Sequence, residues 1–245
     1  MARRRQAGQL RVNLAEEAAE RRRFEQEVAL ARRIQVALLP AEMPQIPGLE
    51  IHGGNIPSRG VSGDYYQIVE RGHGEVAVVV ADVSGKGIAA SLLTASLEAL
   101  VAGPIHDGID PATICRRVSH LLYDRTPPEK FATGFLAYFD PGTARLHYCN
   151  AGHNPGIVMR SGGEVEKLAS TGLPLGMMPS GVYLAAEVHL GAGDTVVLYT
   201  DGITEAIRPK NRRSRHRPRH PTAPSAQCVQ SWHTPCPASD ATLRT

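Results

Sequence analysis

The sequence is poor in cysteine, in aromatic residues and in long apolar runs. Its four cysteines form no CxxC pair, so neither a disulfide framework nor a recognised zinc site is expected. No apolar run approaches the length of a membrane span, and the N-terminal stretch MARRRQAGQLR lacks the apolar core of a signal peptide. These absences predict a cytoplasmic protein that does not act at a membrane.

Two common catalytic motifs are also absent. Residues 84–87 follow an apolar run and contain Lys86, but a glycine comes next, so the phosphate-binding pattern GxxxxGK[ST] is not formed. Ser84 is not surrounded by a GxSxG motif, which presents a serine nucleophile on a sharp turn. The sequence therefore excludes a P-loop nucleotide site and gives no support to a nucleophilic serine.

Charge is distributed unevenly along the chain, whose formal net charge is +3. Residues 208–245 contain eight Lys or Arg and one Asp, a net charge of +7, which leaves 19 Lys or Arg and 23 Asp or Glu, a net charge of −4, for residues 1–207. This tail has six prolines and almost no Leu, Ile, Val or Phe, a composition that cannot bury enough apolar surface to fold. We therefore predict that residues 208–245 are disordered; nucleic-acid binding by this basic tail is the less favoured alternative.

The strongest chemical signal is a set of three aspartates, each at the edge of a different apolar segment. Asp82 follows a run of small and β-branched residues typical of a buried strand, Asp201 follows a second short apolar run, and Asp64 begins an alternating segment. Carboxylates gathered at one rim repel one another, and hard divalent cations such as Mg²⁺ or Mn²⁺ usually hold them together. For Asp82 an alternative is that it only caps the helix expected from Ile88.

Four motifs carry a family resemblance. VSGDYY, ADVSGKGIAASLL, NAGHNP and TDGITEA occur in this order, and the segment LARRIQVALLP precedes them. Over roughly residues 28–207, the chain resembles the bacterial SpoIIE/RsbU-type branch of the PPM (PP2C-like) metal-dependent serine/threonine phosphatases.

The resemblance implies a site with two Mn²⁺ or Mg²⁺ ions. Asp82 resembles the carboxylate that bridges both ions, the carbonyl of Val83 resembles the main-chain ligand beside it, and Asp201 resembles another direct ligand. Asp64 corresponds to an acid that acts through metal-bound water. We expect His153, in NAGHNP, to shape the rim of the site and not to serve as the acid.

The same resemblance implies a reaction and a partner. A metal-activated water would hydrolyse phosphoserine or phosphothreonine on a regulatory protein, typically a STAS-domain anti-anti-sigma factor. Two other classes stay open: a pseudophosphatase regulator that binds the same partner without turnover, and a nucleic-acid-associated protein that acts through the tail.

The C-terminal part departs from the family pattern. Relatives continue after TDGITEA with a further helix, a final metal-binding Asp and a last strand, whereas this chain becomes rich in Pro, Arg and His from Arg208. Asp240 is the one acid in this part, and a frameshifted or truncated terminus explains the change best. The departure predicts a weak or inactive phosphatase with an exposed sheet edge.

Short apolar segments separated by turns predict an α+β fold. Strands are expected near residues 49–55, 64–70, 75–81, 134–140, 145–149, 156–160, 182–190 and 194–200, and helices from residue 88 and over 111–124. Hairpin-length connections favour antiparallel pairing. The resemblance implies an αββα sandwich, in which two antiparallel sheets pack face to face and are flanked by helices.

Residues 10–39 are expected to form one long N-terminal helix, ended by Pro40. A heptad seam runs through Leu10, Leu14 and Phe24, but polar residues such as Gln35 interrupt it. Two interpretations remain: a solvated helix docked on the domain, or a parallel coiled coil that makes a homodimer. The expected division of the chain is residues 1–43 for this helix, 44–207 for the phosphatase domain and 208–245 for the tail.

Overall fold

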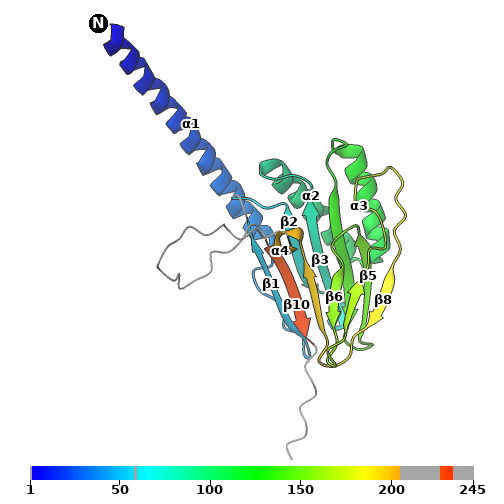
Figure 1. Cartoon of the computed structure of the whole chain (residues 1–245). Coiled ribbons are helices and arrows are strands. Elements are labelled where there is room, and N and C mark those ends of the chain that lie inside the picture. The colour runs from blue at the N-terminus through cyan, green and yellow to red at the C-terminus, as the bar shows by residue number, and fades with distance from the viewer. Residues whose placement is uncertain (1, 58–59, 205–226, 234–245) are drawn as a thin grey trace, which may run out of the picture.

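The computed structural model describes residues 2–57, 60–204 and 227–233 of the chain (Figure 1). The helices are α1 (Ala2–Leu38), α2 (Ile88–His106), α3 (Pro111–Arg125) and the single-turn α4 (Asp201–Thr204), with a 3-10 turn at Gly72–Gly74. The strands are β1 (Glu50–Ile56), β2 (Asp64–Glu70), β3 (Val76–Val83), β4 (Ala132–Asp140), β5 (Arg145–Ala151), β6 (Gly156–Met159), β7 (Val165–Leu168), β8 (Ala186–His189), β9 (Thr195–Tyr199) and β10 (Gln227–His233).

The strands form two sheets of five. One has the order β1-β10-β9-β6-β7 and the other the order β2-β3-β4-β5-β8. Every pair of neighbouring strands within these sheets is antiparallel. The expected α+β class with two antiparallel sheets and a preceding helix is therefore confirmed.

The alternation of side chains in β3 divides the core into two layers. Ala77 and Val79 belong to an apolar cluster with residues of α2 and α3, whereas Val78 and Val80 belong to a cluster that also contains Val196 of β9 in the other sheet. The sheet of β2-β3-β4-β5-β8 is thus covered by helices on one side and by the second sheet on the other. At the second sheet, α4 contacts β10.

Helix α2 corrects one expectation. Residues 88–106 have the length and hydropathy of a membrane span, so the statement that no apolar run approaches that length is wrong. A single helix of this kind is weak evidence, because the core helix of a globular domain passes the same test. Here Ala90, Leu97 and Val101 are buried in the cluster between α2, α3 and the sheet.

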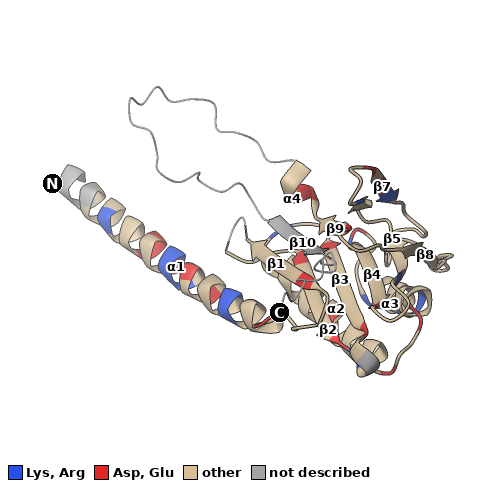
Figure 2. Ribbon diagram, turned by 90° about the horizontal axis from the view of Figure 1, so that it is seen from below, with Lys and Arg blue, Asp and Glu red and all other residues tan. Residues whose placement is uncertain are grey.

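Helix α1 joins the body only through its C-terminal part (Figure 1). Gln35 is buried and makes two hydrogen bonds to the main chain of Ser62: its Nε2 donates to the carbonyl at 2.6 Å, and the Ser62 N–H donates to Oε1 at 2.8 Å. Toward its N-terminus, Leu10, Leu14 and Phe24 are exposed. Figure 2 shows both basic (Lys or Arg) and acidic (Asp or Glu) residues along the length of this helix.

Strand β10 is the main departure from the sequence prediction. It lies between β1 and β9, and Gln230 pairs with Gly53 on one side and Leu198 on the other. The prediction that residues 208–245 are disordered is therefore wrong for residues 227–233, and so is the exposed sheet edge expected from a missing last strand. The remainder of the tail, with Asp240 and most of its basic residues, lies outside the described residues, and the predictions made for it, including the nucleic-acid alternative, stay predictions.

One strand boundary and one additional strand also differ from expectation. Strand β3 continues through Asp82 to Val83, and β7, which was not predicted, pairs with β6 in a hairpin. Asp82 therefore belongs to the strand ladder itself, where it is positioned by neighbours on both sides.

A proline in β10 should destabilise the protein, because it removes a ladder donor from a strand paired on both sides. We expect Gln230→Pro to lower the free energy of unfolding by about 1–3 kcal/mol in urea denaturation. Gln230→Thr keeps the N–H and is the matched control. Amide exchange of the unmodified protein should show protection over residues 228–233; equal stability of both variants together with fast exchange there would refute the central position of β10.

Candidate metal centre

Asp64, Asp82 and Thr133 form a row across three neighbouring strands. Asp64 of β2 pairs directly with Asp82 of β3, which pairs with Thr133 of β4. Directly opposed residues project to the same face of a sheet. Val80, two positions before Asp82, belongs to the core between the sheets. The row therefore lies at the end of the space between the two sheets.

Asp64 has the most perturbed carboxyl group of this row. It is only 4% exposed, and its pKa is raised to about 7 from an ordinary value near 3.8. Burial is the largest cause, the negative charges of Asp82 and Asp201 act in the same direction, and hydrogen bonds to Thr200 and Ser62 oppose the change. A nearby cation would favour the charged form, which makes this carboxyl suited to an ionic ligand.

Gly63 allows a close approach between the main chain before Asp64 and the end of β3. A Cβ atom at this position would lie 3.0 Å from the carbonyl oxygen of Val83 and 3.4 Å from Oδ1 of Asp82. The Val83 N–H in turn donates to the Gly63 carbonyl at 3.2 Å. The glycine therefore keeps space open beside two oxygens that the sequence assigned as metal ligands.

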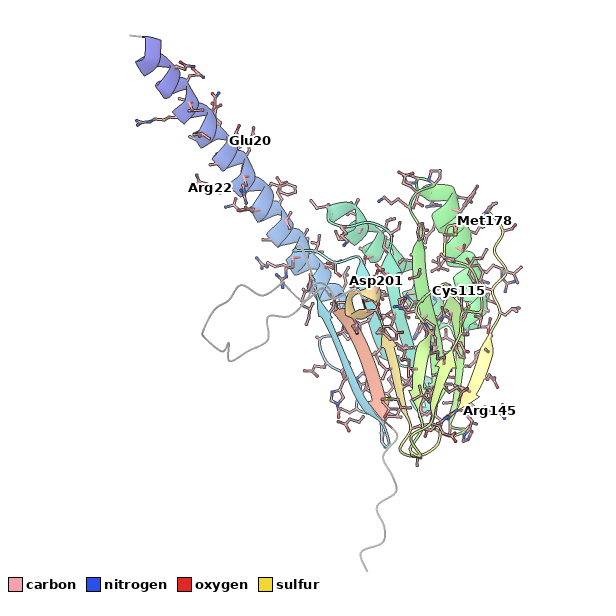
Figure 3. All side chains as sticks on the ribbon, in the orientation of Figure 1. Glu20, Arg22, Cys115, Arg145, Met178 and Asp201 are labelled. Carbon is pink, nitrogen blue, oxygen red and sulfur yellow. The ribbon has the colours of Figure 1, made fainter. Side chains whose placement is uncertain are left out.

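Asp201 approaches from the other sheet. It begins α4 directly after β9 and is exposed. In Figure 3 it lies at the end of the sheets where α4 sits. Its charge contributes to the raised pKa of Asp64, which places the two carboxyl groups at the same end of the sandwich.

Polar contacts join the two sheets at this end. The Nδ2 atom of Asn55, in β1, donates to the carbonyl of Asp64 at 3.0 Å. His153 is 5% exposed, and its Nδ1 lies 2.8 Å from the hydroxyl of Thr133. Burial lowers the pKa of His153 to about 4, so the ring is neutral near neutral pH and cannot act as a ready proton donor there.

The oxygens present fit a hard divalent cation. Carboxylates and a main-chain carbonyl are the ligands that Mg²⁺ and Mn²⁺ prefer. Among the described residues, however, no three His, Cys, Asp or Glu side chains come close enough to share one ion. The two observations agree, because a charge acts over a longer distance than a metal–ligand bond. Asp82 and Asp201 are near enough to raise the pKa of Asp64, but the three side chains are not close enough to coordinate one ion together. The assignment of Asp64, Asp82, Val83 and Asp201 as ligands stays a prediction.

Several site residues escaped the sequence analysis. Gly63 appears there only within the motif VSGDYY, and no sequence signal distinguishes Asn55, Thr133 or Thr200, whose roles depend on strand pairing. The alternative in which Asp82 caps α2 is wrong, since the N-cap of that helix is Gly87.

The raised pKa of Asp64 predicts a pH-dependent stability of the metal-free protein. Because its folded pKa of about 7 exceeds the unfolded value near 3.8, the folded state binds more protons between these pH values, and stability falls as pH rises through that window. Asp64→Asn should remove up to about 4 kcal/mol of this loss. We expect the melting temperature of the variant, in EDTA, to exceed that of the unmodified protein at pH 8 but not at pH 4.

Asp140→Asn is the control for this measurement. Hydrogen bonds from Thr143 and the Gly142 N–H hold the pKa of Asp140 below its ordinary value, so ionisation of this carboxyl does not lower stability as pH rises from 4 to 8. If both variants change the melting temperature equally at pH 4 and pH 8, the crowding of charge at Asp64 is refuted.

Comparisons with known proteins agree with this architecture. Residues 72–232 match the model of the family described as Stage II sporulation protein E (SpoIIE). Phosphoserine phosphatase RsbU of Bacillus subtilis (strain 168) is 30% identical over 180 residues, which cover 73% of this chain and 53% of RsbU. The chain spans 53% of the length of RsbU and 17–45% of the length of four other curated relatives that it matches.

Two solved structures share the fold at low sequence identity. The SiaA-PP2C domain of Pseudomonas aeruginosa aligns with a TM-score of 0.70 and 21% identity over 88% of this chain and 99% of that domain. RsbX, solved in complex with magnesium, aligns with a TM-score of 0.62 and 16% identity over 78% of this chain and 98% of RsbX. The resemblance predicted from the four motifs is confirmed, and the chain belongs to the SpoIIE family of PP2C-type phosphatase domains.

Proposed function

We propose that this chain is a metal-dependent protein phosphatase that hydrolyses phosphoserine or phosphothreonine on a regulatory protein. The observation that supports it most is the direct cross-strand pairing of buried Asp64 with half-buried Asp82, with the Val83 carbonyl beside them. Membership of the SpoIIE family and similarity to a phosphoserine phosphatase, RsbU, point to the same reaction.

In this proposal Asp64, Asp82, the Val83 carbonyl and Asp201 hold two Mn²⁺ or Mg²⁺ ions. Such ions lower the pKa of a water molecule and offset charge on phosphoryl oxygens. The Ser84 hydroxyl is already engaged, because it donates to the Glu129 carbonyl at 3.3 Å and accepts from the Phe131 N–H at 3.0 Å. In this proposal the attacking group is a water molecule, which the carboxylates position.

The proposed partner is a phosphorylated STAS-domain anti-anti-sigma factor in the cytoplasm. The family relationship supports this substrate class. A second candidate is a pseudophosphatase that binds the same partner without turnover, and the open arrangement of the acids among the described residues favours it.

Hydrolysis of a phosphoserine peptide with and without Mn²⁺ tests the function. We expect metal-dependent turnover that Asp82→Ala lowers about a hundredfold or more, because it removes the carboxylate assigned to both ions. Asp201→Asn should have a smaller effect, and Asp124→Asn, which changes an exposed acid on α3, should have none. Binding of the phosphopeptide without turnover would favour the pseudophosphatase, and full activity of Asp82→Ala would refute the site.

We also propose that α1 forms a parallel homodimer through its apolar seam. Leu10, Leu14 and Phe24 are 55–60% exposed, which is costly for an isolated helix and suits a second copy.

Sedimentation equilibrium tests this dimer. We expect Leu14→Glu to shift the protein to a monomer, whereas Val12→Glu, an exposed apolar position off the seam, should remain dimeric. A monomeric unmodified protein would contradict the coiled coil and favour the docked helix.

A further inference from the structure

His153 is held rigidly by the segment that carries it. Its main-chain N–H donates to Oδ1 of Asn150 at 2.8 Å, and Asn150 is fully buried. The side chain amide of Asn150 lies 3.4 Å from the carbonyls of Asn154 and Leu168, so the turn is closed on itself. The main chain of His153 is therefore fixed, and because the side chain is only 5% exposed the imidazole ring has little room to rotate.

The two ring nitrogens have different surroundings. Nδ1 lies 2.8 Å from the hydroxyl of Thr133, at the start of β4. Nε2 is buried without a hydrogen bond of ordinary geometry, although the main chain of Tyr199, the last residue of β9, lies near enough to oppose the lowering of the ring's pKa. The ring thus occupies the gap between the end of β9 and the start of β4.

Thr133 and Tyr199, the two residues near the ring, are each adjacent in the structure or the sequence to a candidate metal ligand. Thr133 is the cross-strand partner of Asp82, and Tyr199 stands two residues before Asp201. The imidazole therefore lies beside the cross-strand partner of Asp82 and close to the strand end that precedes Asp201.

We propose that His153 is a positioning residue, which sets the separation of Asp82 and Asp201 by bridging Thr133 to the end of β9 and so tunes the affinity of the site for divalent cations. This inference rests on the proposed function, since it requires that these aspartates bind metal. A residue of this kind holds the ligands and does not touch the reacting atoms.

The alternative is a histidine that only fills space in the turn. Removing such a residue would lower the stability of the fold but would leave the affinity of correctly folded protein for metal unchanged. Stability and metal affinity must therefore be measured separately.

The test compares Mn²⁺ affinity, by calorimetric titration, with the melting temperature in EDTA for four variants. His153→Ala removes both contacts, His153→Asn keeps a polar group near the position of Nδ1, and Thr133→Val removes the hydroxyl without changing the volume. The fourth variant combines His153→Ala with Thr133→Val. Peptide hydrolysis by each variant at saturating Mn²⁺ provides a KM and a kcat.

We expect His153→Ala and Thr133→Val each to weaken Mn²⁺ binding about tenfold, the lower end for residues that orient metal ligands. His153→Asn should restore part of the affinity. The double variant should bind about as weakly as either single variant, because both changes break the same bridge. At saturating Mn²⁺ the KM for the peptide should stay unchanged.

Two results would overturn the inference in different ways. If the unmodified protein binds Mn²⁺ and the folded variants bind it equally well, His153 has only a structural role and the proposed function stands. If the unmodified protein binds no Mn²⁺, the proposed function and this inference fail together. Should His153→Ala not fold, Thr133→Val decides the question alone.

Discussion

The repulsion between Asp64, which is buried, and Asp82, which is half-buried and directly paired with it across two strands, is the interaction around which the local structure is arranged. Burial and mutual repulsion both oppose ionisation of Asp64. Hydrogen bonds from Thr200 and Ser62 compensate only in part, since the pKa remains raised. The apolar layers elsewhere in the sandwich must outweigh this local penalty. A divalent cation bound between these carboxylates would offset their repulsion, so the crowding that destabilises the metal-free rim would favour metal binding.

The two sheets are held together differently at the rim and in the middle. Inside the sandwich, residues such as Val80, Phe135 and Leu198 pack as an apolar cluster, whose energy changes gradually with separation. At the rim, directional contacts replace this packing: Asn55 reaches the main chain of Asp64 across the sheets. Hydrogen bonds weaken steeply outside a narrow range of distance and angle. The spacing of the carboxylates is consequently defined more sharply than apolar contacts alone would define it.

The sequence predicts the acids of the site better than their supports. Asp82 stands out because an acid at the end of a buried apolar run is costly, and that signal needs no knowledge of the fold. Thr133 and Asn55 carry no such signal, since their relation to Asp82 and Asp64 depends on strand register and on which strands become neighbours. Strand β10 was missed for a related reason. Its composition is weak for a strand, but a segment placed between β1 and β9 gains ladder hydrogen bonds on both sides, and this context outweighs propensity.

Gln35 explains why the apolar seam of α1 is interrupted near its end. A polar residue on such a seam weakens a coiled coil, and a buried amide is costly unless its donors and acceptors are satisfied. Both are satisfied here by the main chain of Ser62, and the Ser62 hydroxyl accepts in turn from the N–H of Asp64 at 3.1 Å. The last turns of α1 and the turn that carries Asp64 are therefore joined by an unbroken series of hydrogen bonds. A displacement of this end of the helix must either break these bonds or move the Asp64 turn with it. The position of the long helix therefore constrains the position of Asp64.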